Sequence, residues 1–181
     1  METDFTTAYV GLGSNLGDRP GNLLMAIRGM IEASFEVCQL SAIYETEPVD
    51  IESDITFLNM VAEVRFPVGM VAPSQMMARL LRIEYLLGRR DKSIKRARTI
   101  DLDLLFFGKL QTNTEFLTLP HPRLHLRRFV LCPLAEIAPH YVHPVLRKEI
   151  FEILTETDDR SEVKRWDPNA AIEAELEAIT A

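Results

Sequence analysis

Strand-like and helix-like segments alternate along the N-terminal part of the chain in an order that few folds accept. Apolar residues recur at helical spacing after Asp18 and again after Pro73. Strand-like runs fall at 6–12, 35–46, 57–66 and 99–107. The resulting order, β-α-β-β-α-β, predicts a ferredoxin-like α+β core, an antiparallel sheet with helices on one face. A short hairpin near 110–119 and extra C-terminal helices near 129–137 and 147–154 are expected to follow.

Each predicted core helix has an apolar stripe. The first stripe consists of Leu23, Leu24, Ile27, Met30 and Ile31, and the second of Met76, Leu80, Ile83 and Leu87. Asp18 and Pro20 are suited to begin the first helix, and Gly88 to end the second.

We expect one domain over residues 1–155 and an acidic tail over 156–181 that is weakly ordered or helical, with a helix at 173–179. The N-terminus is acidic and resembles neither a secretory signal nor a transit peptide. Cys38 and Cys132 stand far apart, which favours reduced, packed thiols over a disulfide. A cytoplasmic location is the expectation.

Charge is distributed unevenly, although the net charge is −7. Residues 89–98 hold six basic residues and one acid. Such density costs self-repulsion unless an anion neutralises it, so a phosphate site and a solvated basic loop are equally open readings. The acidic total argues against a broad nucleic-acid surface. No apolar run reaches the roughly 18 residues that span a bilayer, so no membrane association is expected.

Asp101 and Asp103 are the sharpest chemical signal. Residues i and i+2 of a strand share a face and lie about 6–7 Å apart. Two acids in an otherwise apolar strand repel each other, and a hard cation such as Mg²⁺ relieves that cost. The basic segment ends three residues earlier, which places phosphate-binding groups beside metal-binding groups, as phosphoryl transfer requires. The alternative is a solvent-facing pair without a ligand.

Other candidates leave two readings open. Glu84 lies at the edge of an apolar stripe and could bind a ribose hydroxyl or pair with Arg82 or Arg89. His121 lies between Pro120 and Pro122, which would hold a functional imidazole in place, yet a loop histidine without a role is as plausible. The glycine-rich segment 11–17 does not have dinucleotide-binding spacing and is interpreted as a strand-to-helix turn.

The same residues resemble a known family, the 6-hydroxymethyl-7,8-dihydropterin pyrophosphokinases, from about Ala8 to Pro139. The segments that carry the resemblance are YVGLGSNLGD at 9–18, YETEPV at 44–49, FLN at 57–59, RIE at 82–84, RTIDLDLL at 98–105, LPHPRL at 119–124 and RRFVL at 127–131. The order and spacing of the last three are highly specific.

The resemblance implies a reaction in which the hydroxymethyl oxygen of a reduced pterin attacks the β-phosphorus of ATP and AMP leaves. It implies two Mg²⁺ ions on Asp101 and Asp103. The catalytic positions it implies are Arg89, Arg96, Arg98, Asp101 and Asp103. Pterin-binding positions are Thr46, Val49, Phe57, Asn59 and Phe129. ATP-binding positions are Glu84, Arg89, Arg98, Leu104, Thr118, His121 and Arg127. ATP and the pterin are the expected partners, and the chain is expected to be a monomer or a weak homodimer.

The chain departs from the family pattern just before the aspartates. The family commonly has Arg-Trp-Gly-Pro-Arg there, whereas residues 94–98 read IKRAR, so Arg96 or Lys95 would replace a loop arginine. Phe116 lies where some members of the family have a nucleotide-contacting arginine, and Leu126 replaces a common glutamate. Two alternatives to an active enzyme follow: a nucleotide- or pterin-binding regulator without turnover, and a ferredoxin-like interaction domain with a solvated acidic pair.

Overall fold

The computed structural model describes residues 4–47, 56–89 and 97–170, and all structural statements below concern these ranges. Its elements are β1 (Phe5–Ser14), α1 (Arg19–Glu32), β2 (Glu36–Leu40), β3 (Tyr44–Thr46), β4 (Phe57–Pro67), α2 (Pro73–Leu86), β5 (Asp101–Phe107), β6 (Thr112–Asn113), β7 (Thr118–Leu119), the 3-10 turn η1 (Leu124–Leu126), α3 (Arg128–Ile137), α4 (Ile150–Glu156) and β8 (Val163–Arg165). The predicted β-α-β-β-α-β order is confirmed.

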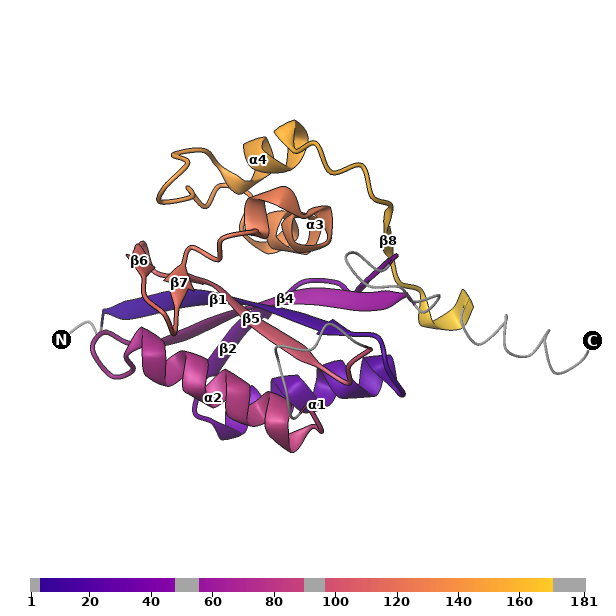
Figure 1. The fold of residues 1–181 in the computed structure, drawn as a ribbon, viewed down its shortest axis with the longest axis horizontal. Helices are drawn as coiled ribbons and strands as arrows, with labels where there is room; N and C mark the ends of the chain where they lie inside the picture. Colours follow the sequence, from indigo (N-terminus) through magenta and orange to yellow (C-terminus); the bar gives the residue numbers. More distant parts are fainter. Residues whose placement is uncertain (1–3, 48–55, 90–96, 171–181) are drawn as a thin grey trace, which may run out of the picture.

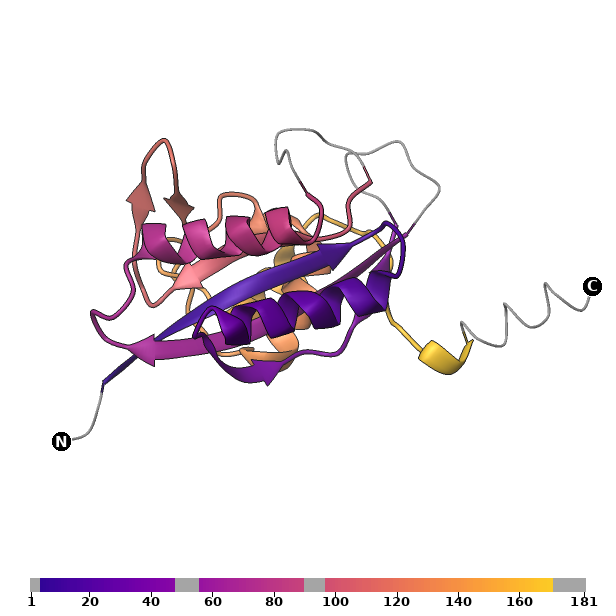
Figure 2. The ribbon, with the colours of Figure 1, turned by 90° about the horizontal axis from the view of Figure 1, so that it is seen from below.

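The main sheet is antiparallel, with strand order β5-β1-β4-β3-β8 and β2 also paired with β4. Helices α1 and α2 cover one face side by side, while α3 and α4 stack over the opposite face (Figures 1 and 2). Strands β6 and β7 form the predicted small hairpin apart from the main sheet. The second face is therefore partly roofed by helices, and the site lies where that roof ends.

The predicted strand at 35–46 is interrupted at Ser41, whose side-chain hydroxyl and not a backbone carbonyl accepts the hydrogen bond from β4. The Ser41 hydroxyl accepts a hydrogen bond from the Val61 N–H at 2.9 Å, and Ser41 N–H donates to Val61 O at 2.9 Å. The ladder with β4 continues on either side as β2 and β3.

Two stripe residues of the first helix were assigned wrongly. Leu24 is 64% exposed and Ile31 57% exposed, whereas Leu23, Ala26 and Met30 are fully buried. The spacing of i, i+3 and i+7 through the small Ala26 sets the buried face, which lets the helix approach the sheet closely. The stripe of α2 is confirmed for Met76, Leu80 and Ile83.

Regular alternation along the strand at 99–107 predicts that Leu104 and Phe106 share one face and that Leu105 and Phe107 share the other, but this alternation breaks after Leu104. Val10 pairs with Leu104 but its neighbour Tyr9 pairs with Phe106, so Leu105 is the extra residue of a bulge. Leu105 and Phe106 both join the apolar cluster under α3, while Phe107 packs with the cluster under α1 and α2. Phe106 and Phe107 thus lie on faces opposite to those predicted.

The chain after residue 156 forms an element that the sequence pattern did not predict. Strand β8 pairs with β3, with Val163 opposite Thr46. The expected helix at 173–179 lies outside the described residues, and the division into a domain and a tail stays a prediction. Within the described ranges, α-helices fall short of the length and apolarity that a bilayer crossing needs.

Candidate active site

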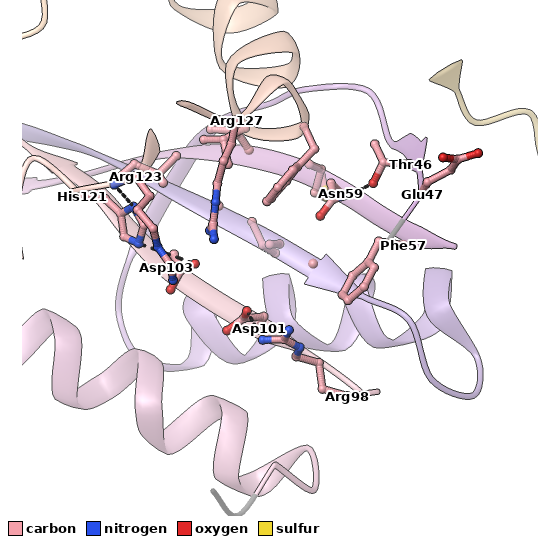
Figure 3. Close-up of a pocket in the computed structure, with 18 of the residues that line it drawn as sticks. Thr46, Glu47, Phe57, Asn59, Arg98, Asp101, Asp103, His121, Arg123 and Arg127 are labelled. Atoms are coloured by element: carbon pink, nitrogen blue, oxygen red, sulfur yellow. Dashed lines mark hydrogen bonds and ion pairs between the residues drawn. The ribbon is translucent and has the colours of Figure 1, made fainter. Parts of the chain in front are cut away.

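The floor of the main cavity is bare backbone. This cavity, of about 330 Å³, lies on the sheet face beside α3 (Figure 3). Gly11 and Gly13 occupy the middle strand β1, where Gly11 pairs with Asp103 and Gly13 with both Asp101 and Asn59. A Cβ on Gly13 would lie 3.0 Å from Asn59 Oδ1. Glycine therefore leaves an open strip between the acids of β5 and the amide of β4.

The two aspartates occupy one face of β5 and line this cavity, as predicted (Figure 3). Asp101 Oδ1 accepts from Arg89, and Asp101 Oδ2 accepts from Arg98 Nη1 at 2.7 Å. Their side chains keep 21% and 31% of their surface exposed, in chain order. Acids and guanidinium groups therefore meet at the cavity wall, and the acid pair is not simply solvated.

Glu84 is a buried member of the same ion-pair network. Its Oε1 accepts from Arg89 Nη1 at 3.0 Å and from the Leu102 N–H at 2.6 Å. The residue is 2% exposed and does not line this cavity. Of the two readings from sequence, the structural ion pair is the one this geometry favours. Glu84 thereby fixes Arg89 and the beginning of β5 together.

Asn15 fixes the neighbouring arginine through its backbone. Asn15 Oδ1 accepts from the Arg98 N–H at 2.7 Å, and Asn15 N–H donates to Arg98 O at 3.2 Å. Asn15 is fully buried. The turn after β1, interpreted from sequence only as a connection, therefore helps to hold a cationic wall of the site.

His121 and two further arginines form the end of the cavity nearest β7. His121 Nδ1 accepts from the Arg123 N–H at 3.3 Å, so a neutral ring carries its proton on Nε2. That nitrogen lies 4.0 Å from Asp103 Oδ2. Arg123 and Arg127 both line the cavity. Figure 3 shows these side chains converging on the Asp103 side.

The opposite end of the cavity is aromatic and amide-lined. The Arg98 Cζ lies 5.5 Å from the Phe57 ring centroid, and the Arg127 Cζ lies 5.4 Å from the Phe129 ring centroid. Asn59 Nδ2 donates to Thr46 Oγ1 at 2.8 Å, and that amide is 6% exposed. Two ring faces and an oriented amide suit a flat heterocycle.

A smaller cavity of about 240 Å³ adjoins the first, since Asp103 and His121 line both. It also contains two predicted ATP-binding positions, Leu104 and Thr118, together with Phe116. Asp103 and His121 therefore stand where the two cavities meet.

Most predicted site residues come together in this way. The exceptions are Val49 and Arg96, which lie outside the described residues, and Glu84, which is packed behind the wall. Reasoning from sequence missed Gly11, Gly13, Asn15 and Arg123. Glycines two apart inside a strand-like run next to an acid-bearing strand were the available signal for the floor.

The donors fit a hard divalent cation. The described residues contain no group of three or more metal-ligating side chains. The chain thus offers the two carboxylates of Asp101 and Asp103 at an open wall, which is how Mg²⁺ is commonly held when phosphates and water complete its shell. Arg89 and Arg98 place positive charge at Asp101 in this structure.

Paired carboxylates, converging arginines and an aromatic pocket on one sheet face define the class of the protein, a transferase that handles phosphate groups. A family model described as 7,8-dihydro-6-hydroxymethylpterin-pyrophosphokinase matches residues 9–139. The chain belongs to this family.

The chain is 42% identical over 131 residues to the 2-amino-4-hydroxy-6-hydroxymethyldihydropteridine pyrophosphokinase of Bacillus subtilis, covering 72% of this chain and 77% of the relative. It is 34% identical over 150 residues to the Aquifex aeolicus protein of the same name, covering 83% and 91%. A solved HPPK-DHPS of Plasmodium falciparum superposes with a TM-score of 0.65 at 17% identity over 86% of this chain. The chain spans 45% of that structure, and this likeness concerns the fold.

Proposed function

We propose that the protein transfers diphosphate from ATP to the hydroxymethyl group of 6-hydroxymethyl-7,8-dihydropterin, giving AMP and the pterin diphosphate, a step of folate biosynthesis. Family membership and the names of the bacterial relatives support this assignment. The observation that carries it to this site is the joining of an amide-lined ring pocket to a carboxylate–arginine wall in one cavity.

The ring end is proposed to bind the pterin. Phe57 and Phe129 offer ring faces, and stacking of this kind adds about 0.5–1.5 kcal/mol beyond area burial. Asn59 is held by Thr46, so its amide is oriented before the ligand arrives. A fixed donor and acceptor suit the lactam and amine edge of the pterin. Val49 remains part of the proposed pterin site although it lies outside the described residues.

The charged end is proposed to bind the triphosphate. Arg98, Arg123 and Arg127 line the cavity around the acids, and guanidinium forks suit phosphate oxygens. Arg89 lines the same cavity and pairs with Asp101, whereas Arg96 lies outside the described residues. The adenosine end is proposed to extend past His121 into the smaller cavity at Leu104 and Thr118.

Asp101 and Asp103 are proposed to hold Mg²⁺, with two ions expected when ATP is present. When bound, Mg²⁺ would neutralise charge on the phosphate oxygens. The protein's own residues position the substrates: the ring pocket aims the hydroxymethyl group toward the acid pair, and the arginines compensate negative charge on the moving group. Because little proton chemistry is required, positioning carries most of the task.

The test is release of AMP from ATP in the presence of Mg²⁺ and the reduced pterin. Wild type should release AMP only when both the pterin and Mg²⁺ are present. Asp103→Ala should reduce turnover by at least about 100-fold with the same thermal unfolding midpoint, because its carboxylate serves the ligand and not the core. Asp158→Ala, which removes an exposed acid, is the control.

Two results would contradict the proposal in different ways. ATP- and pterin-dependent thermal stabilisation without AMP release would indicate a binding protein that lost turnover. The absence of stabilisation by either ligand would indicate an interaction domain. A cytoplasmic location and a monomeric or weakly dimeric state stay predictions.

A further inference from the structure

A segment outside the region matched by the family model holds two walls of the ring pocket together. Residues 157–166, here called the C-terminal strap, run from the end of α4 past α3 down to the sheet edge (Figure 1). The family match ends at residue 139. The strap contacts α3 at one end and β3 at the other, and each of these elements contributes residues to the cavity.

At its first end the strap places a carboxylate on the beginning of α3. Asp159 Oδ2 accepts a hydrogen bond from the Arg128 N–H at 2.7 Å, while Asp159 Oδ1 accepts from the Ser161 N–H at 2.8 Å. Arg128 is the first residue of α3. A remote carboxylate thus satisfies an N–H that the helix itself leaves open, and its charge suits the positive end of the helix dipole.

The ionisation of Asp159 agrees with this contact. Burial disfavours the charged form, but the hydrogen bonds from the Arg128 and Ser161 backbones, with the Arg128 charge, outweigh it and lower the pKa of Asp159 below its ordinary value. The carboxylate is therefore a charged acceptor at neutral pH.

The residue that Asp159 holds stands between two residues of the site. Arg127 and Phe129 flank Arg128, and both line the cavity. The Arg127 guanidinium also lies over the Phe129 ring. A shift of the first turn of α3 would therefore move the ring face and the guanidinium together.

At its second end the strap fixes β3. Val163 pairs with Thr46, and Trp166 N–H donates to Ile43 O at 2.9 Å. Thr46 in turn orients the Asn59 amide. The two elements are also joined directly, because Glu136 of α3 accepts a hydrogen bond from Tyr44 OH of β3 at 3.0 Å. The strap therefore contacts the elements that position both the Phe129 ring and the Asn59 amide.

We propose that Asp159 is a positioning residue for the pterin end of the site, acting through the Arg128 N–H on Phe129 and Arg127. The inference rests on the proposed function. It predicts that loss of the carboxylate weakens pterin binding more than ATP binding. Of the groups proposed for the triphosphate end, Arg127 moves with the first turn of α3, whereas Asp101 and Asp103 are held by β5 and Arg98 by Asn15.

The test compares Asp159→Ala and Asp159→Asn with wild type in steady-state kinetics and in pterin binding measured by fluorescence with a non-hydrolysable ATP analogue. Asp159→Ala should raise the KM and the Kd for the pterin about 5- to 10-fold, the scale of a lost helix cap, while the KM for ATP stays within about twofold. Asp159→Asn keeps the shape and one acceptor, so its effect should be smaller. Asp158→Asn, which neutralises the adjacent exposed acid, should match wild type.

The outcomes separate this inference from the proposed function. The positioning role alone would be overturned if wild type turns over and both Asp159 variants have the same pterin KM as Asp158→Asn. An equal rise in the KM for both substrates, or a lower kcat with an unchanged pterin KM, would indicate a purely structural role and would also overturn it. If Asp159→Ala does not fold, Asp159→Asn with its retained acceptor decides the matter.

Discussion

Asn15 and Arg98 lie 83 residues apart in the sequence, and two hydrogen bonds join the buried Asn15 to the backbone just before β5. The side chain of Asn15 accepts from the Arg98 N–H at 2.7 Å, and its backbone N–H donates to Arg98 O at 3.2 Å. Arg98 then reaches Asp101 Oδ2 at 2.7 Å. The turn after β1 and the acid-bearing strand are therefore one structural unit.

Asn15→Ala should lower kcat/KM for ATP by at least about tenfold, because small displacements of positioning groups are costly. The Arg98 N–H would be left without its acceptor in a buried place, which also costs about 1–3 kcal/mol of stability. Asn22→Ala is the matched control, because the Asn22 amide donates to Ser14 Oγ at 3.2 Å and to Leu16 O at 2.8 Å, on either side of Asn15, and these bonds do not involve Arg98. Equal kinetics for the two variants would contradict this role of Asn15.

Gly13→Ala and Gly11→Ala should behave differently, although both add one methyl group to the same strand. A Cβ at Gly13 would lie 3.0 Å from Asn59 Oδ1, whereas the atoms nearest to a Cβ at Gly11 belong to the Leu105 side chain and lie at 3.5 Å or beyond. We expect Gly13→Ala to raise the Kd for the pterin at least about tenfold, since overpacking commonly costs 1–3 kcal/mol. Gly11→Ala should change it about threefold or less. Calorimetric titration of both variants checks this, and similar affinities would refute the floor described here.

Arg19 links the end of β3 to the residue that precedes β4. Its Nη1 donates to Glu45 Oε1 at 3.0 Å and to Thr56 O at 2.9 Å, and these residues directly adjoin Thr46 and Phe57. Arg19→Gln should therefore raise the KM for the pterin by about 3- to 10-fold, on the scale of one ordinary hydrogen bond.

The control for Arg19 is Arg28→Gln, which removes the same charge from the exposed face of α1, where Arg28 pairs with Glu32 at 2.7 Å. Steady-state kinetics should show a pterin effect for Arg19→Gln alone. A matching change in Arg28→Gln would assign the effect to net charge and not to the connection between the two strands.

His143 should make the stability of the protein depend on pH between 6.5 and 4. Burial, then the nearby His125, lowers the pKa of His143 to about 4, and its Nδ1 accepts from the Val145 N–H at 3.2 Å and the Leu146 N–H at 3.1 Å. The unfolded chain binds more protons in this range, so the free energy of unfolding should fall as the pH drops below 6.5 and level off below about 4. The limiting slope is about 1.4 kcal/mol per pH unit.

Denaturant unfolding at several pH values measures this slope. His143→Asn keeps an acceptor but cannot titrate, so its stability should fall less steeply than that of wild type over the same range. His140→Asn, which removes an 82% exposed imidazole side chain, should retain the wild-type slope. Parallel curves for wild type and His143→Asn would show that the buried ring does not control acid stability.

The order of elements could be predicted because each has enough residues to display a period. Asp101 and Asp103 could be assigned to one face because the spacing along a strand fixes it. The bulge at Leu105 could not, since it depends on how β5 pairs with β1. Strand β8 was missed for a similar reason: its alternation is short and charged, and its stability comes from pairing with β3.

The site was partly predictable by the same reasoning. The acid pair and the basic segment before it could be recognised from the residue pattern, whereas Phe57, Phe129 and Arg127 were expected only from the resemblance to the family. Glu84 had two readings because its partners, Arg89 and Leu102, are set by the packing of α2 on β5. The contribution of Asn15 depends on a partner far along the chain, and the role of Gly13 on two neighbouring strands at once.

A backbone segment, unlike a side chain, cannot change its rotamer when a ligand binds. Because Gly11 and Gly13 of β1 have no side chains, peptide groups of this strand form part of the cavity floor, and the depth of the cavity there is set by the sheet. A larger residue at position 13 would make the cavity shallower, whereas no substitution there would make it deeper. Under the proposed function the two phenyl rings contact the faces of the heterocycle, so this fixed part of the floor would limit how far an edge of the ring can enter the cavity.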